Sequence, residues 1–100
     1  MNPPYGGRNG LTPWLKRFVA HGNGVCLVPD RTSAPWWQWI ARRVDLVLFL
    51  DGKVKFVGPG GVVGNQPANG SCLMAMGDQG RGALVRASNA GLGFLVMKVV

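Results

Sequence analysis

The sequence predicts a single small α/β domain. After residue 10, segments with helical periodicity and helix caps alternate with short apolar runs bounded by Gly or Pro, a pattern typical of α/β proteins. A length of 100 residues with 47% hydrophobic residues suffices for one small core. The predicted order is loop, helix, strand, helix, strand pair, strand, helix, strand. We interpret this order as one flank of a doubly wound sheet.

The first predicted helix lies within LTPWLKRFVAHG, residues 11–22. Thr12 is the expected N-cap, Pro13 fits the first helical position, and Gly22 is expected to end the helix. The apolar positions that fall on one stripe of this helix are Trp14, Leu15, Phe18 and Val19.

The next segment, GVCLVP at residues 24–29, is a continuous apolar run. Such a run predicts a strand buried on both faces, as in a parallel sheet. Pro29 is expected to close this strand at its carboxyl end.

The second half continues the alternation. A cap at Thr32 or Ser33 introduces a tryptophan-bearing helix, and the Asp51-Gly52 pair between VDLVLFL and KVKF predicts a β-hairpin. Residues 58–70 are rich in Gly, Pro and Asn and do not match a phosphate-binding glycine motif, so we expect a surface loop. A strand at 71–76, a short helix at 80–90 and a final strand at 94–100 complete the chain.

The charge balance is strongly basic. Eleven Lys and Arg stand against four acidic residues, all Asp, which gives a net charge of +7. This excess favours a polyanionic partner, with nucleic acid first and an anionic membrane surface second, or it simply keeps the chain in solution. No apolar stretch is long enough for a membrane span, and the sequence starts without a secretory signal pattern.

The cysteine and histidine content indicates no metal site. Cys26 and Cys72 lie in apolar, strand-like surroundings, and His21 is the single histidine, so no metal-ligand spacing is present. We expect two buried, reduced thiols, as in a cytoplasmic protein. We expect His21 at a helix carboxyl terminus rather than in catalysis.

The segment Asn2-Pro3-Pro4-Tyr5 matches one chemical need. The exocyclic amino group of a nucleobase is a poor nucleophile because its lone pair is conjugated into the ring. The Asn2 side-chain oxygen and a backbone carbonyl of the Pro-Pro segment could accept hydrogen bonds from the two N–H groups of the amino nitrogen. These hydrogen bonds would free its lone pair. Tyr5 could stack on a base that has left the duplex. The alternative is an ordinary Asn-Pro turn.

These residues resemble the catalytic motif of amino-group DNA methyltransferases, and the chain is similar to the phage-type DNA adenine-N6 methyltransferase (Dam-like) family from about residue 2 to residue 76. After residue 76 the resemblance is weaker. The elements that carry it, in order, are NPPYGG, Trp14, LVP at 27–29, Arg31-Thr32, Trp36-Trp37 and GKVKF at 52–56.

The resemblance implies a partial Rossmann-like methyltransferase sheet, namely the C-terminal half of the domain, spanning residues 1–100 with the catalytic loop at 2–7. It implies S-adenosylmethionine as the cofactor and double-stranded DNA as the substrate. Asn2, Pro3 and Tyr5 would contact the flipped adenine, and Pro4 would shape the loop.

Arg31, Lys53 and Lys55 are candidate phosphate contacts, with a solvated basic face as the alternative. The main cofactor motif of such enzymes is not found in this sequence, so the cofactor-binding residues are unknown. We therefore expect a truncated or split phage or bacterial enzyme that begins at an internal methionine and acts with an N-terminal half or by self-association. A cytosine-N4 enzyme and a non-enzymatic basic nucleic-acid-binding remnant remain as alternatives.

Overall fold

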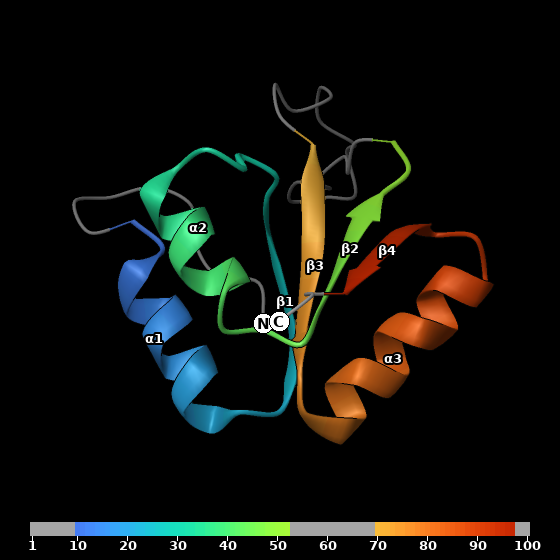
Figure 1. The fold of residues 1–100 in the computed structure, drawn as a ribbon, viewed down its shortest axis with the longest axis horizontal. Helices are drawn as coiled ribbons and strands as arrows, with labels where there is room; N and C mark the ends of the chain where they lie inside the picture. The colour runs from blue at the N-terminus through green and yellow to red at the C-terminus, as the bar shows by residue number, and fades with distance from the viewer. Residues whose placement is uncertain (1–9, 53–69, 98–100) are drawn as a thin grey trace, which may run out of the picture.

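The computed structural model describes residues 10–52 and 70–97. It contains seven elements in these ranges: α1 (Thr12–His21), β1 (Gly24–Pro29), α2 (Pro35–Ala41), β2 (Leu46–Leu50), β3 (Ser71–Met76), α3 (Gly77–Asn89) and β4 (Gly93–Met97). The predicted α/β class is confirmed. Figure 1 shows three layers, with α1 and α2 on one side of the sheet and α3 on the other.

The sheet has the strand order β1-β3-β2-β4, and all of its neighbouring strands are antiparallel. The prediction that β1 pairs in a parallel sheet is therefore wrong. The apolar run of β1 did indicate correctly that helices cover both faces of the sheet. It carries no information about the direction of the neighbouring strand, because burial on both faces is compatible with either direction.

Two of the strands nevertheless point the same way. β1 and β2 are each antiparallel to β3, so they run in the same direction, and α2 forms the crossover between them. β3 is inserted between the two strands and β4 lies outside β2.

The hairpin predicted around Asp51-Gly52 does not supply the partners of β2. The neighbours of β2 are β3 and β4, which occupy its two edges. The KVKF segment that was expected to pair with β2 lies outside the described residues.

The first helix differs from the prediction at its start and agrees at its end. Leu11 is the N-cap and Thr12 is already helical, without a capping hydrogen bond from its side chain. At the other end Gly22 adopts a φ of 76° and its N–H donates to the Phe18 carbonyl at 3.1 Å, as in a glycine C-cap. Trp14, expected on the core stripe, is 38% exposed.

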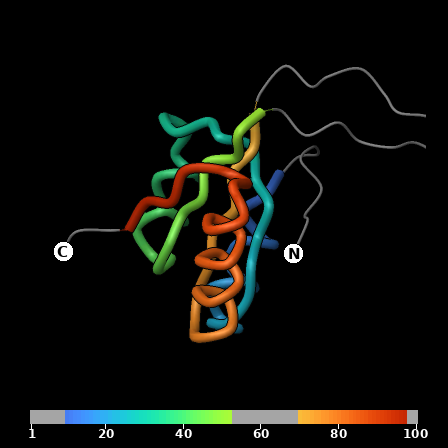
Figure 2. Tube along the Cα trace, turned by 90° about the vertical axis from the view of Figure 1, so that its right-hand side faces the viewer, coloured from blue at the N-terminus to red at the C-terminus, as the bar shows by residue number. Residues whose placement is uncertain are grey.

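The third helix begins three residues earlier than predicted because distant side chains cap it. The Asp45 carboxylate accepts from the Gly77 N–H at 2.9 Å, and the Asn23 side-chain oxygen accepts from the Gln79 N–H at 3.2 Å. These acceptors satisfy N–H groups that have no partner inside the helix. In Figure 2 the molecule is turned so that α3 faces the viewer.

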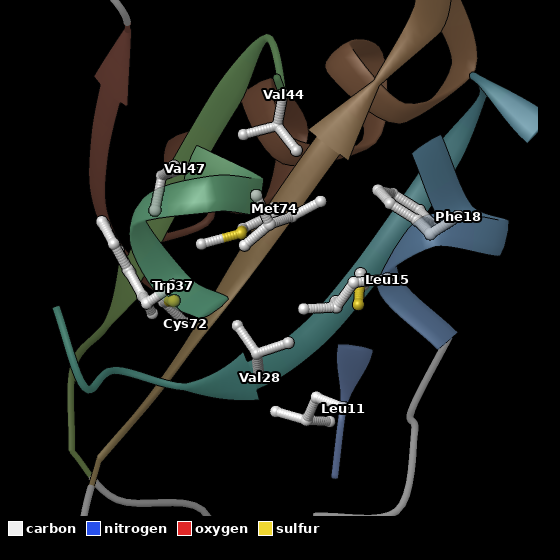
Figure 3. Close-up of a cluster of buried hydrophobic side chains, with 11 residues drawn as sticks. Leu11, Leu15, Phe18, Val28, Trp37, Val44, Val47, Cys72 and Met74 are labelled. Carbon is white, nitrogen blue, oxygen red and sulfur yellow. The ribbon is translucent and has the colours of Figure 1, made fainter. Parts of the chain in front are cut away.

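Each face of the sheet has its own buried cluster. On the side of α1 and α2, the buried residues are Leu11, Leu15, Phe18, Cys26, Val28, Trp37, Ile40, Val44, Val47, Cys72 and Met74, most of which are labelled in Figure 3. On the side of α3 they are Leu46, Leu48, Ala75 and Leu84. The alternation of side chains along β2 and β3 divides these strands between the two clusters.

Candidate nucleic-acid interface

Most of the residues predicted to form the site lie outside the described part of the chain. Asn2, Pro3, Pro4 and Tyr5 belong to residues 1–9, and Lys53 and Lys55 belong to residues 53–69. The described chain starts at residue 10 and enters α1 at Thr12. Of the candidate residues, Arg31 is described, and it is exposed.

Arg31 stands at the edge of the sheet where β1 and β2 end. The pairs Pro29–Ser71 and Phe49–Cys72 place the carboxyl ends of β1 and β2 beside the start of β3. The Asp30 N–H donates to the Gly70 carbonyl at 3.1 Å and continues this alignment past the last pair. Lys53 follows Gly52 in the sequence, so the chain segment that carries it leaves β2 at this same edge.

The loop that carries Arg31 is held by short-range hydrogen bonds. The Thr32 N–H donates to the Asp30 carbonyl at 2.9 Å, and the Ala34 N–H donates to the Arg31 carbonyl at 3.0 Å. The Gln38 amide of α2 also donates to the Thr32 carbonyl at 2.6 Å. The Arg31 guanidinium has no ion-pair partner within residues 10–52 and 70–97.

The depression beside Arg31 does not fit S-adenosylmethionine. Five consecutive loop residues, 30–34, line an open depression of about 450 Å³ beside Arg31. This loop offers one carboxylate, that of Asp30, and no aromatic or large aliphatic wall against which an adenine ring could pack. Ligand sites of this kind are usually enclosed and largely apolar. The cofactor is therefore not assigned to this loop.

The layer formed by α1 and α2 combines aromatic rings with cations. The Arg43 guanidinium lies 4.0 Å from the centre of the Trp39 ring, and that of Arg17 lies 5.4 Å from the Trp14 ring. Arg43 also donates to the Trp39 carbonyl at 2.7 Å. These contacts hold positive charge next to aromatic faces.

This aromatic and basic layer was missed by the sequence analysis. In the structure Trp37 is buried, while Trp36 and Trp39 are partly buried and pack against the edge of the core. The signal that could have revealed the layer is the absence of any acidic residue from both helices.

The two cysteines are free and buried, as predicted. Burial raises the pKa of Cys26 from 9.0 to about 11 and that of Cys72 to about 12. The indole N–H of Trp37 partly offsets the rise in the pKa of Cys72, although no well-formed hydrogen bond to the indole nitrogen is present. Thiols with raised pKa values are poor nucleophiles. Both cysteines therefore act as core residues and not as reactive thiols.

None of the helices in the described ranges has the length and apolar character needed to cross a bilayer. Within the same residues, no group of three or more His, Cys, Asp or Glu side chains could hold a metal ion. His21 is exposed as the last residue of α1.

Comparisons with known proteins give no relatives. No family model matches the chain, and neither a curated protein nor a solved structure matches it at a significant level.

Proposed function

We propose that this chain is the catalytic-loop half of an S-adenosylmethionine-dependent DNA methyltransferase that acts on the N6 amino group of adenine. The observation that carries the proposal is the Asn2-Pro3-Pro4-Tyr5 segment, followed in order by the other elements of the family's pattern. The proposal includes a truncated or split form of the enzyme.

The arrangement of β1, α2 and β2 supports the Rossmann-like part of the proposal. Two strands that run in the same direction and are joined by a helix form the repeating unit of doubly wound folds. In such folds the ligand lies beyond the carboxyl ends of these strands. In this chain those ends carry Arg31 and lead into the segment with Lys53 and Lys55. The antiparallel insertion of β3 between β1 and β2 distinguishes this sheet from a purely parallel one.

The chemistry assigned to this chain concerns the target base. Once the adenine has left the duplex, Tyr5 stacks on its ring. The Asn2 side-chain oxygen and a carbonyl of the Pro3-Pro4 segment accept hydrogen bonds from the two N–H groups of the amino group. This arrangement draws the nitrogen toward tetrahedral geometry and makes its lone pair available. S-adenosylmethionine supplies an electrophilic methyl group when it is bound.

The basic residues are assigned to the DNA backbone. Arg31, Lys53 and Lys55 would contact phosphates and hold the duplex in register, without reading the sequence. Each phosphate contact releases counterions, so the affinity for DNA should fall steeply with salt concentration.

Methyl transfer is tested with labelled S-adenosylmethionine and two duplexes of equal length. One duplex contains adenine, and the other consists of G·C pairs alone. The proposal expects label in the first duplex, none in the second, and loss of label for Asn2→Ala. Label in the G·C duplex would indicate cytosine-N4 transfer instead.

The second candidate is a basic nucleic-acid-binding remnant without enzymatic activity. The net charge of +7 favours it, as does the absence of the family's main cofactor motif from the sequence. In that case the chain gives no methyl transfer, binds DNA in a salt-sensitive way, and has the same affinity after Asn2→Ala. If label is transferred to adenine by the unmodified chain, this second candidate is excluded.

A further inference from the structure

The two helices on one face of the sheet enclose a groove that the proposed methyl transfer does not use. It has a volume of about 290 Å³, close to the lower end of the range for ligand pockets. Its lining residues are Thr12, Leu15 and Lys16 of α1 and Pro35, Trp36 and Trp39 of α2.

The walls of the groove are set by helix periodicity. Trp36 and Trp39 are three residues apart, so they share one side of α2, while Trp37 is turned into the core. Thr12 and Lys16 are four residues apart and share one side of α1. The groove therefore has two indoles on one wall and an exposed ammonium group on the other.

The charge around the groove has one sign. Residues 10–22 and 34–44 carry Lys16, Arg17, Arg42 and Arg43 and contain no Asp or Glu. Arg43 lies over the Trp39 ring, so one of these charges is next to the aromatic wall. A partner that fits this surface carries negative charge and presents flat rings.

We propose that the groove between α1 and α2 binds single-stranded nucleic acid, with a base against Trp36 and Trp39 and the adjoining phosphate near Lys16. Indoles bind the faces of unstacked bases, and cations follow the backbone, in proteins that bind single strands. A duplex hides the faces of its bases, so it does not supply this ligand. The inference is independent of the catalytic role proposed for Asn2-Pro3-Pro4-Tyr5.

The experiment measures binding of a fluorescein-labelled oligo(dT) strand by fluorescence anisotropy. This probe contains no adenine, so its binding is separate from recognition of a methylation target. We expect saturable binding that weakens by about tenfold or more in Trp36→Leu, since loss of one base–aromatic stack typically has an effect of this size. Trp36→Phe keeps an aromatic face and should restore most of the affinity.

A matched pair of charge variants separates the groove from general attraction. Lys16→Ala removes a cation that lines the groove, and Arg86→Ala removes an exposed cation from α3 on the opposite side of the sheet. We expect Lys16→Ala to weaken binding several-fold more than Arg86→Ala. Circular dichroism and thermal melting check that each variant is folded.

Three outcomes would overturn the proposal. The first is no saturable binding of oligo(dT) by the unmodified chain. The second is equal weakening by Lys16→Ala and Arg86→Ala with no effect of a folded Trp36→Leu, which would indicate charge alone. The third is preference for anionic vesicles or for duplex DNA over the single strand, again without an effect of Trp36→Leu.

Discussion

Two glycines of α3 allow the packing of this helix against β1 to be tested by a single type of substitution. Gly80 lies against the first residue of β1, and a Cβ at that position would be 2.2 Å from the Gly24 carbonyl oxygen. Gly82 is two residues further along the same helix. A Cβ there would come within 3.2 Å of one atom, at the end of the flexible Arg86 side chain.

The magnitudes follow from these distances. Gly→Ala in a helix interior stabilises by about 0.5–1 kcal/mol, and this gain applies to both positions. At Gly80 the new Cβ would lie more than 1 Å inside ordinary contact with a backbone atom, and overpacking of this kind costs about 1–3 kcal/mol or more. We expect a net loss of about 2 kcal/mol for Gly80→Ala and a gain of up to about 1 kcal/mol for Gly82→Ala.

Thermal and urea denaturation measure the difference. For a domain of this size, each kcal/mol shifts the melting temperature by about 4–8 °C. The two variants should therefore melt about 8–24 °C apart, with Gly80→Ala below and Gly82→Ala at or above the unmodified chain. Equal shifts in the same direction would refute the close approach of α3 to β1.

Three further predictions concern stability. Leu84→Ala removes a buried side chain on the α3 side of the sheet and should lower the free energy of unfolding by about 2–5 kcal/mol. Val85→Ala, at the adjacent exposed position, should change it by less than about 0.5 kcal/mol. Similar losses for the two variants in urea denaturation would contradict the burial pattern. Asp45→Ala removes the acceptor for the first N–H of α3 and should cost about 1 kcal/mol, measured in the same assay, where no loss would argue against the cap. Because burial raises the pKa of Cys26 to about 11 and that of Cys72 to about 12 from 9.0, the unfolded chain releases these protons first as pH rises. The thiol contribution is therefore fully present below pH 9 and is lost as pH rises toward the folded pKa values. Cys72→Ala should flatten the fall of unfolding free energy with pH above 9, and an unchanged slope would contradict the assignment.

Local signals account for the elements that were predicted well. The glycine after α1, the Gly and Pro that bound β1, and the apolar run of β3 all act within a few residues, and each element was found near its expected place. The error at the start of α1 is also local. Thr12 and Pro13 are each one position further into the helix than expected, because Leu11 takes the N-cap position without a side-chain capping hydrogen bond.

Long-range contacts account for the parts that were predicted wrongly. The start of α3 depends on Asn23 and Asp45, which are far from it in sequence. The order of the strands depends on the insertion of β3 between β1 and β2, a choice among edges that the hydrophobic pattern does not express. An Asp-Gly pair favours a hairpin, but it cannot show that both edges of the preceding strand will be occupied by other partners.

The candidate site was predicted from the sequence only in its chemistry. The residue types of Asn2-Pro3-Pro4-Tyr5 suggest how an amino group could be activated, and the basic residues suggest a phosphate partner. β1 and β2 run in the same direction, so the chain continues from their carboxyl ends to Arg31 and toward Lys53 at the same edge of the sheet. This direction became known only from the pairing of both strands with β3.

The distribution of charge over the three layers connects the fold with both proposals. On α3, Arg81 forms ion pairs with Asp78 and with Asp45, the latter at 3.9 Å, so its charge is largely balanced. The layer of α1 and α2 has several cations and no carboxylate. Among the described residues, the excess of positive charge is therefore concentrated on this layer. A polyanion that approaches the described part of the molecule is attracted to this layer, next to the groove with two indoles.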